Sequence, residues 1–590
     1  MTKRKVSGKI FDLDLFSKLL VFIRPFRTTY YFVMMSAILL SLFSTLTPYL
    51  LKVTVDDYIR PKDYQGMIFF VGLMFITLLL EVIFQFLFVF YANWLGQKVI
   101  KNLRVKLFNK IIYFKMAYFD KTAVGRLVTR SVSDIETIAS IFSQGLFMII
   151  ADLLKMILVI LVMLYVDWRL SIIVFSILPV IIYATRLFQK SMKKAFEEVR
   201  IQVANLNSFV QERISGIKIV QLFNRQKIEY NNFISINEKH KKAWLKTVWF
   251  NSIFFPIAEI SSSVTIGLLV WYGGFDIISG GDISLGTIFL FIQMSQMLFR
   301  PLRQIADKFN SLQMGMVSAE RIFEILEKES IIKDEGSFIP TQIMGSINIK
   351  QLIFSYTPGE TVINDISVEI KSGEKVALVG ATGAGKSTII NLISRLYEFD
   401  SGDIEIDGIS IRDYDLKSLR NRVSVVLQEV FLFADSLYNN ITLYNTQITR
   451  DMVIKASKEI GVHNFIESLP QGYDYNVKER GVMLSSGQRQ LIAFLRAYIT
   501  QPAILVLDEA TSSVDSYSEE IIQRAIDKLT HGKTSIIIAH RLATVKNADR
   551  ILVMDGGKIV EEGTHEELLK VKGSNYSKLY EVQFADEIAI

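Results

Sequence analysis

A glycine-rich run carries the clearest chemical signal in the sequence. Residues 380–388 read Gly-Ala-Thr-Gly-Ala-Gly-Lys-Ser-Thr, the full G-x-x-x-x-G-K-S pattern of a phosphate-binding loop. In such a loop the backbone N–H groups curl around the β- and γ-phosphates of a nucleotide, Lys386 neutralises their charge, and the Ser387 hydroxyl can ligate Mg²⁺. The pattern therefore predicts a nucleotide site made by Gly380, Thr382, Gly383, Gly385, Lys386, Ser387 and Thr388.

Two adjacent carboxylates supply the second part of this chemistry. The apolar run over 503–507 predicts a buried parallel strand, and Asp508 and Glu509 follow it directly. Carboxylates at the carboxyl end of such a strand lie where nucleotides bind in open parallel sheets. We assign Asp508 to Mg²⁺ binding and Glu509 to polarising the attacking water. A structural ion pair is the alternative.

These motifs require a soluble α/β domain, and the chain has one beyond about residue 336. No stretch there reaches 18 apolar residues, and short strand-like runs alternate with helical ones. A strand-like run over 375–379 precedes the glycine-rich loop, and helical apolar spacing over 389–396 follows it. We predict a nucleotide-binding domain over 345–590, preceded by a charged linker over 328–344.

The first half of the chain has the composition of a membrane domain. The 590 residues are 50% hydrophobic, with a mean hydropathy of +0.32. Apolar stretches long enough to cross the roughly 30 Å core of a bilayer cover 28–51, 67–94, 141–166, 170–188, 250–271 and 285–302. Apolar spacing over 16–23 predicts an amphipathic helix at the inner interface. We predict an interfacial elbow helix in 1–27 and a six-helix transmembrane domain over 28–327 with two long loops.

Charge sets the orientation of this domain. The loop after the second span carries nine Lys or Arg between 98 and 130, whereas the short loops are neutral or acidic. The positive-inside rule therefore places the long loops, both termini and the nucleotide-binding domain in the cytoplasm. The net charge of +7 reflects this topology, and we expect no nucleic-acid partner. The absence of Cys excludes disulfides and thiolate metal sites.

A few charged residues fall inside the predicted spans. Because charge in lipid is costly, each is expected to face the helix bundle or a wet cavity. Asp152 and Lys155, three residues apart on one helical face, are expected to neutralise each other. Glu81, near the middle of the second span, is our candidate for a contact in the substrate cavity, with hydrogen bonding between helices as the alternative.

A family resemblance appears just upstream of the carboxylate strand. Leu484-Ser485-Ser486-Gly487-Gln488-Arg489-Gln490 resembles the LSGGQ signature of ATP-binding cassette (ABC) proteins. Further motifs match the family in order: Tyr356 (A-loop), Gln428 (Q-loop), Glu479 with Gly481 (X-loop), Ser512-Ser513-Val514-Asp515 (D-loop) and His540 (H-loop). In the membrane half, Tyr118-Phe119-Asp120 resembles a first coupling helix. The whole chain resembles one half of a six-plus-six-helix (type IV) ABC exporter.

The resemblance implies a multidomain membrane protein in which an all-α transmembrane domain with long cytoplasmic helical extensions precedes an α/β P-loop domain. It implies ATP-driven export of hydrophobic or amphipathic compounds across the inner (plasma) membrane by alternating access, with ATP and Mg²⁺ as cofactors. In this family two ATP sites lie at the interface of two cassettes. The alternatives are a homodimeric lipid flippase and an ATP-gated channel or regulator that does not pump.

The resemblance also assigns roles to residues. Tyr356 would stack on adenine, Gln428 would contact Mg²⁺ or water, and His540 would hold the γ-phosphate. The signature residues Ser485, Ser486, Gly487 and Gln488, together with the D-loop residue Asp515, would serve an ATP site shared with the partner.

One position departs from the family pattern. The third signature residue is Ser486, where the family has Gly, and a side chain there crowds a backbone that must approach the triphosphate closely. Glu509 and His540 are intact. This combination resembles the consensus half of a heterodimeric exporter, so we predict a different partner subunit with a degenerate ATP site. A homodimer that tolerates a small residue is the alternative.

Overall fold

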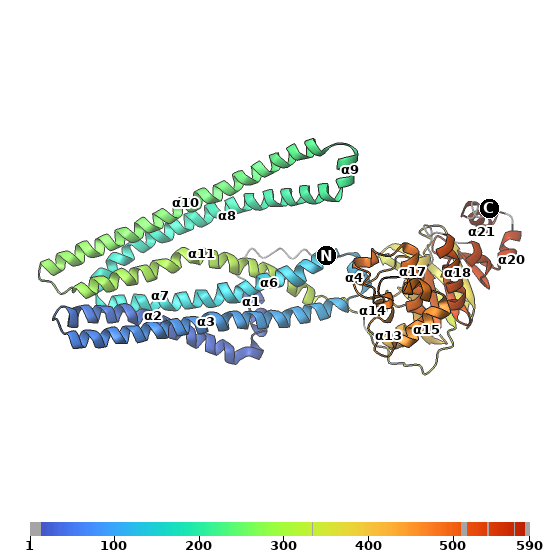
Figure 1. Ribbon diagram of the computed structural model, residues 1–590, viewed down its shortest axis with the longest axis horizontal. Coiled ribbons are helices and arrows are strands. Elements are labelled where there is room, and N and C mark those ends of the chain that lie inside the picture. Colours follow the sequence, from blue (N-terminus) through green and yellow to red (C-terminus); the bar gives the residue numbers. More distant parts are fainter. Residues whose placement is uncertain (1–12, 333, 509–515, 540–541, 572, 584–590) are drawn as a thin grey trace. The chain divides into compact units, whose positions relative to one another are not determined.

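The computed structural model describes residues 13–332, 334–508, 516–539, 542–571 and 573–583 (Figure 1). These residues form two compact units. The first comprises Met1–Ile112 and Ala123–Glu329, and the second comprises Tyr113–Thr122 and Ser330–Ile590. We call them the membrane unit and the cassette unit. The short segment Tyr113–Thr122 thus belongs to the cassette unit although it is flanked in sequence by the membrane unit.

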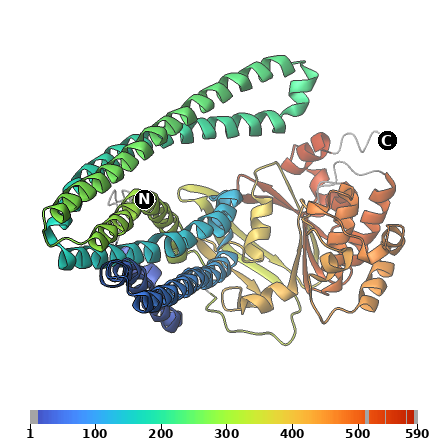
Figure 2. The same ribbon diagram turned by 60° about the vertical axis from the view of Figure 1, so that its left-hand side comes forward.

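The membrane unit is helical throughout. Its helices are α1 (Leu13–Val21), α2 (Arg27–Val53), α3 (Tyr64–Ile112), α5 (Val124–Thr129), α6 (Ile135–Ser140), α7 (Phe147–Val166), α8 (Trp168–Ser215), α9 (Ile217–Leu222), α10 (Gln226–Ile278) and α11 (Leu285–Glu327). A 3₁₀ turn over Arg24–Phe26 and π-helical turns over Thr54–Ile59, Arg130–Asp134 and Ile141–Leu146 join some of them. Figures 1 and 2 both show α8 and α10 side by side, connected by α9.

Among the described residues, five helical stretches are long and apolar enough to cross a membrane: Arg24–Ile59, Tyr64–Ile112, Phe147–Val166, Trp168–Ser215 and Gln226–Ile278. They cover the first five predicted spans, except that the third begins at Phe147 because Ile141–Leu146 forms a π-helical turn. The sixth predicted span begins helix α11, which is not one of the five. Gln293, Gln296 and Arg300 interrupt its apolar stretch.

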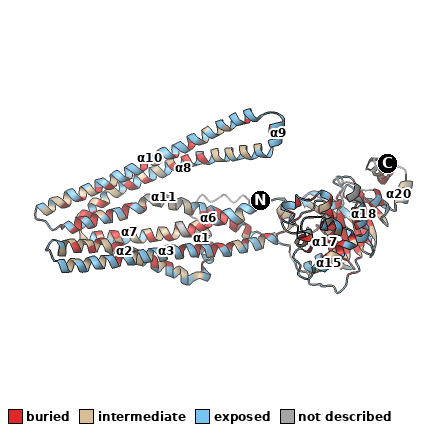
Figure 3. Ribbon diagram, in the orientation of Figure 1, coloured by how far each residue is buried: buried red, intermediate tan, exposed pale blue. Residues whose placement is uncertain are grey.

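Several helices continue far beyond a bilayer, in line with the cytoplasmic helical extensions that the family resemblance implies. Helix α8 has 48 residues and α10 has 53, and at 1.5 Å per residue each spans roughly 70–80 Å. Helix α10 runs to Ile278, beyond the predicted span over 250–271, and residues 279–284 connect it to α11. Figure 3 shows many exposed residues along α3, α8 and α10. On α3 these include Phe69, Phe75 and Phe86, an apolar surface suited to lipid.

The cassette unit contains two sheets. The antiparallel sheet has the order β2-β1-β4-β5 and the second sheet has the order β10-β9-β3-β8-β7-β6. In the second, β9, β3, β8, β7 and β6 are parallel and β10 is an antiparallel edge. The strands are β1 (Ile347–Thr357), β2 (Glu360–Ile370), β3 (Lys375–Gly380), β4 (Ser401–Ile406), β5 (Ile409–Ser410), β6 (Val423–Val426), β7 (Ile504–Asp508), β8 (Thr534–Ile538), β9 (Arg550–Asp555) and β10 (Lys558–Gly563).

Helices surround these sheets. They are α4 (Met116–Asp120), α12 (Lys386–Ile393), α13 (Leu416–Arg422), α14 (Leu437–Thr442), α15 (Arg450–Ile460), α16 (His463–Glu467), α17 (Ser486–Ile499), α18 (Ser516–Thr530), α19 (Leu542–Lys546), α20 (His565–Lys570) and α21 (Asn575–Gln583), with 3₁₀ turns over Gly472–Asp474 and Glu479–Gly481. Helix α12 ends at Ile393, three residues before the predicted end.

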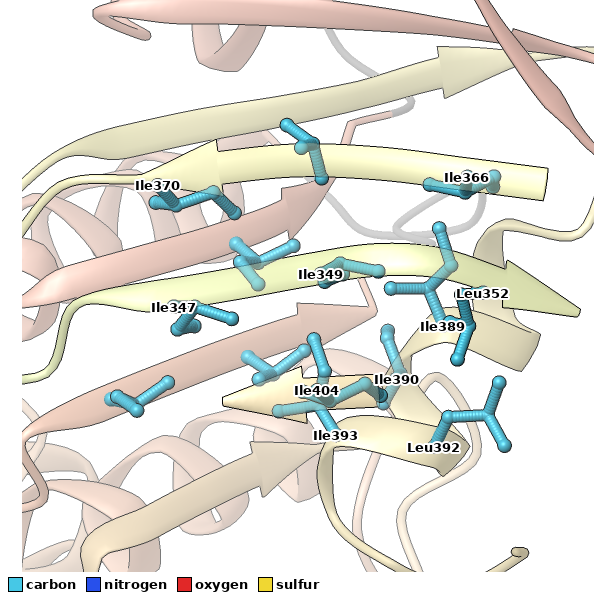
Figure 4. Packing of buried hydrophobic residues seen from close by; sticks show 14 of the residues in the cluster. Ile347, Ile349, Leu352, Ile366, Ile370, Ile389, Ile390, Leu392, Ile393 and Ile404 are labelled. Atoms are coloured by element: carbon cyan, nitrogen blue, oxygen red, sulfur yellow. The ribbon is translucent and has the colours of Figure 1, made fainter. Parts of the chain in front are cut away.

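The core of the cassette unit fixes helix α12. Figure 4 shows Ile389, Ile390 and Ile393 of α12 packed beside Ile349 and Ile404 of the antiparallel sheet. All five side chains are at least 97% buried. Fully burying an aliphatic side chain stabilises a fold by about 1.5–3 kcal/mol. The first turn of α12, which carries the phosphate-loop residues, is therefore anchored by packing.

Candidate nucleotide-binding site

The phosphate-binding loop joins β3 to α12, as predicted. Gly385 has a φ of +100°, a left-handed conformation that disfavours residues with a Cβ. At Gly380 the close approach of another chain segment excludes a side chain, because a Cβ there would lie 2.2 Å from the Met554 carbonyl oxygen. Thr382 and Gly383 are exposed at the tip of the loop. Two glycines of the motif thus meet physical demands of this backbone.

Lys386 lies folded back over the loop. Its Nζ donates hydrogen bonds to the carbonyl oxygens of Gly380, at 2.7 Å, and Ala381, at 3.0 Å. The residue is 9% exposed. Burial lowers the pKa of Lys386 below its ordinary value, and the carboxylate of Asp508 opposes that shift. A buried ammonium group whose hydrogen bonds go to carbonyl oxygens is well placed to bind an anion.

The predicted magnesium ligands converge on the same place. Ser387 Oγ donates a hydrogen bond to Asp508 Oδ2 at 3.2 Å. Asp508 is the last residue of β7 rather than the first after it, and a single strand, β8, separates β7 from β3. A hydroxyl and a carboxylate oxygen are hard ligands of the kind that Mg²⁺ prefers, and Mg²⁺ completes its shell with water and phosphate. These residues fit a magnesium ion.

Other predicted catalytic residues follow closely in sequence after the carboxyl ends of β6, β7 and β8. Gln428 comes two residues after β6, which pairs with β7, and its side chain is exposed. Glu509 follows β7, and His540 comes two residues after β8 ends. Glu509, His540 and the D-loop residue Asp515 lie outside the residues that the structure describes.

Tyr356 lies near the end of β1, beside helix α12. Its hydroxyl donates to Thr388 Oγ1 at 3.3 Å and accepts from Asn391 Nδ2 at 3.3 Å. Phe354 and Tyr397 contact the ring edge-on, with ring centroids 4.8 and 5.1 Å away. The side chain is 37% exposed. Tyr356 is thus a partly exposed aromatic surface joined to the phosphate-loop helix, and Thr388 serves to hold it.

The signature residues form the start of helix α17. Ser485 and Gln488 make a reciprocal capping box: Ser485 Oγ accepts from the Gln488 backbone N–H at 3.2 Å, and Gln488 Oε1 accepts from the Ser485 backbone N–H at 2.9 Å. Gly487 is buried, whereas Ser486 is exposed and is the first helical residue. Because the backbone at Ser486 is helical, its conformation does not itself require glycine.

The charged residues of the membrane unit pair differently from the prediction. Asp152 on α7 forms an ion pair with Lys308 on α11, not with Lys155. Lys155 is half-buried and lies within electrostatic range of Glu81, Asp152 and Arg300. The partner of Asp152 comes from a helix distant in sequence, so spacing along α7 could not reveal it. Glu81 on α3 is half-buried near a cation, and its role in a substrate cavity remains a prediction.

Comparison with known proteins agrees with this architecture. Residues 30–302 match the ABC transporter transmembrane region, and residues 363–512 match the ABC transporter family. The uncharacterized ABC transporter ATP-binding protein YknV of Bacillus subtilis is 34% identical, over 97% of this chain and 95% of its own. The ATP-dependent lipid A-core flippases of Syntrophus aciditrophicus and Haemophilus influenzae are each 33% identical, over 98% and 99% of this chain and 95% and 100% of their own.

A helical membrane region and a phosphate-loop domain thus follow each other in one chain, and relatives match both along nearly their whole length. The chain belongs to the ABC transporters: it is an exporter-type half-transporter, a multi-pass membrane protein that works as a dimer and whose cytoplasmic cassette hydrolyses ATP to drive transport.

Proposed function

We propose that the chain is one subunit of an exporter that uses ATP to move hydrophobic or amphipathic compounds out across the cytoplasmic membrane by alternating access. The convergence of Lys386, Ser387 and Asp508 carries the ATP-dependent part of this proposal. Relatives named as lipid A-core flippases favour a lipid-like substrate class. The domain division is proposed as elbow helix 1–27, transmembrane domain 28–327, linker 328–344 and cassette 345–590.

In this proposal the cassette residues share the work on ATP. The loop from Gly380 to Lys386 holds the β- and γ-phosphates, Thr388 holds Tyr356, and Tyr356 stacks on the base. Ser387, Asp508 and Gln428 would hold Mg²⁺, which neutralises phosphate charge when bound. Glu509 orients the attacking water and His540 holds the γ-phosphate. Ser485 to Gln488 serve the partner's ATP, since the N-terminus of α17 favours an anion.

The transport proposal can be tested by probe-stimulated ATP hydrolysis. The transporter in lipid nanodiscs would be given Hoechst 33342, a fluorescent phospholipid, or calcein as a polar control. An amphipathic substrate is expected to bind in the transport cavity and to raise the rate of ATP hydrolysis, whereas calcein should leave that rate unchanged. Stimulation by calcein alone would contradict the proposed substrate class.

We also propose that the partner is a different subunit with a degenerate ATP site. Ser486 supports this, because its exposed side chain lies at the first turn of α17, where the partner's triphosphate would approach. Purified alone in nanodiscs, the chain is expected to bind ATP but to turn over at about a hundredth of the rate of the two-subunit complex or less. The rate is measured as phosphate release.

The variant Ser486→Gly distinguishes the two kinds of dimer. In the heterodimer it is expected to raise turnover, because it restores close approach of the signature backbone at the degenerate site. Robust turnover by the chain alone, lost in Glu509→Gln and unchanged in Ser486→Gly, would instead establish a homodimer in which Ser486 is harmless.

Glu81→Gln is expected to raise the transport KM for cationic probes such as ethidium by up to about tenfold, which corresponds to about 1.4 kcal/mol. The reason is that the carboxylate would oppose a bound cation in a site of low dielectric. The KM for a neutral probe should stay unchanged. Asp152→Asn is the matched control, because it neutralises a carboxylate that already pairs with Lys308. Equal effects on cationic and neutral probes would point to helix packing instead.

A further inference from the structure

Tyr397 lies between the base-binding candidate Tyr356 and a segment far away in sequence. Its ring stands edge-on to that of Tyr356, with an interplanar angle of 89° and 5.1 Å between centroids. Its hydroxyl donates a hydrogen bond to Asp120 Oδ2, at the end of α4. Both contacts lie within the cassette unit. Asp120, Tyr397 and Tyr356 are thus linked in series by two direct contacts.

The backbone that carries Tyr397 is held firmly. Arg395 is buried and donates to Glu398 Oε1 at 3.1 Å and to the carbonyl oxygens of Ile411, at 3.3 Å, and Tyr414, at 3.4 Å. These bonds anchor the loop two residues before Tyr397, so the contacts of its ring and of its hydroxyl belong to a side chain with a restrained backbone.

Asp120 belongs to the segment Tyr113–Thr122, which continues directly from the long helix α3. Within the cassette unit, the Lys115 backbone N–H donates to the Ser330 carbonyl oxygen at 2.6 Å, and the ring of Phe114 packs on Tyr118 at 4.5 Å. Asp120 itself is exposed, so its hydrogen bond with Tyr397 can form and break without unfolding a core.

Tyr397 remains a donor at physiological pH. Burial raises the pKa of its hydroxyl above the ordinary tyrosine value, and the hydrogen bond to the Asp120 carboxylate raises that pKa further. The contact is therefore a charge-assisted hydrogen bond, which is stronger than one between neutral groups.

We propose that Tyr397 is a positioning residue that couples occupation of the nucleotide base site to the segment Tyr113–Thr122. A base stacked on Tyr356 fixes the Tyr356 ring, the edge-on contact fixes Tyr397, and the Tyr397 hydroxyl fixes Asp120. The inference rests on the proposed function, in which Tyr356 binds the base. It implies that the segment responds to a complete nucleotide and responds less to phosphates alone.

Because the chain contains no Cys, a single introduced cysteine can carry a fluorophore that reports on the segment Tyr113–Thr122. Met116 is an exposed residue of α4, and Met116→Cys would carry a single bimane fluorophore in the full-length transporter in nanodiscs, with its partner subunit where one is required. The probes are the Mg²⁺ complexes of AMP-PNP and of inorganic tripolyphosphate, which lacks a base. Both are used at saturation, so that differences in affinity do not affect the comparison.

In the unmodified sequence, AMP-PNP is expected to shift the bimane emission at least about twice as far as tripolyphosphate does. In Tyr397→Phe the AMP-PNP shift should fall to the tripolyphosphate level, while the affinity for AMP-PNP changes less than about threefold. Tyr498→Phe is the matched control, since the Tyr498 hydroxyl makes the same kind of bond to Glu459, at 2.9 Å, and should behave like the unmodified sequence.

Variants of Asp120 test the other partner of the bond. Asp120→Ala should lower the AMP-PNP shift of the bimane emission as far as Tyr397→Phe does, and the double variant should lower it no further. Asp120→Asn keeps an acceptor oxygen and should retain most of the shift. These exposed substitutions test the same bond if Tyr397→Phe fails to fold.

The inference is overturned if the bimane emission of Tyr397→Phe responds to AMP-PNP as that of the unmodified sequence does. It is also overturned if tripolyphosphate and AMP-PNP produce equal shifts in the unmodified sequence. Failure of the underlying base site looks different. Tyr356→Ala would then leave the affinity for AMP-PNP unchanged, whatever Tyr397 does.

Discussion

Replacing Glu509 by glutamine is expected to lower ATP turnover by about 10²–10⁴-fold, the usual contribution of a general base, while ATP remains bound. Asp508, the residue before Glu509 in the sequence, ends β7 and accepts a hydrogen bond from Ser387 of the phosphate loop. The proposed role of Glu509 is to orient the attacking water there. Glutamine has nearly the same shape and can donate and accept hydrogen bonds, but it cannot take up a proton. The variant should therefore hold ATP in a closed dimer.

Phosphate release and retention of radiolabelled ATP measure the two parts of this prediction. Glu520→Gln is the control, because Glu520 on α18 is exposed and pairs with Arg524 on the surface, at 2.7 Å. It should leave turnover within about twofold, in keeping with the small energies of surface ion pairs. Unchanged turnover in Glu509→Gln would refute the assignment of Glu509.

Lys386→Ala is expected to lower ATP affinity by about a hundredfold or more, and turnover with it. The ammonium group is buried and is held by the carbonyl oxygens of Gly380 and Ala381. Removing a buried charge from a charge-assisted contact costs about 2–5 kcal/mol of binding free energy, and 2.7 kcal/mol corresponds to a hundredfold. Equilibrium binding of a fluorescent ATP analogue gives the affinity directly.

Lys375→Ala is the matched control for this substitution. Lys375 begins the same strand, β3, at the end opposite the phosphate loop, and its Nζ lies 3.8 Å from Asp527. It should leave ATP affinity unchanged. Normal ATP binding by Lys386→Ala would contradict the assignment of the phosphate loop.

The parts of the fold that could be predicted rest on short-range signals. The strand before the phosphate loop and the helix after it follow from local hydrophobic spacing and from the glycine pattern, and the structure has both. The convergence of Ser387 and Asp508 could also be expected, since parallel strands bring their carboxyl ends to one edge. The long helices α8 and α10 match the cytoplasmic helical extensions that the family resemblance implies.

The contacts that could not be predicted join residues distant in sequence. Asp152 pairs with Lys308 instead of its expected partner Lys155. Asp120 accepts a hydrogen bond from Tyr397, and no sequence motif links these two residues. Such pairs depend on how whole elements pack, which spacing along one helix does not encode. The same holds for the neighbours of Glu81, so the chemistry of a substrate cavity is the least predictable part of the chain.

Uphill flux separates a pump from an ATP-gated channel, because the two differ in flux and not in ATP binding. Inside-out vesicles containing the transporter would be given Hoechst 33342 with ATP or with AMP-PNP. An ATP-driven exporter is expected to accumulate the dye above its external concentration with ATP, but not with AMP-PNP and not in Glu509→Gln. Equal dissipation of a preset gradient with ATP and with AMP-PNP, without accumulation, would contradict it and identify a gated channel.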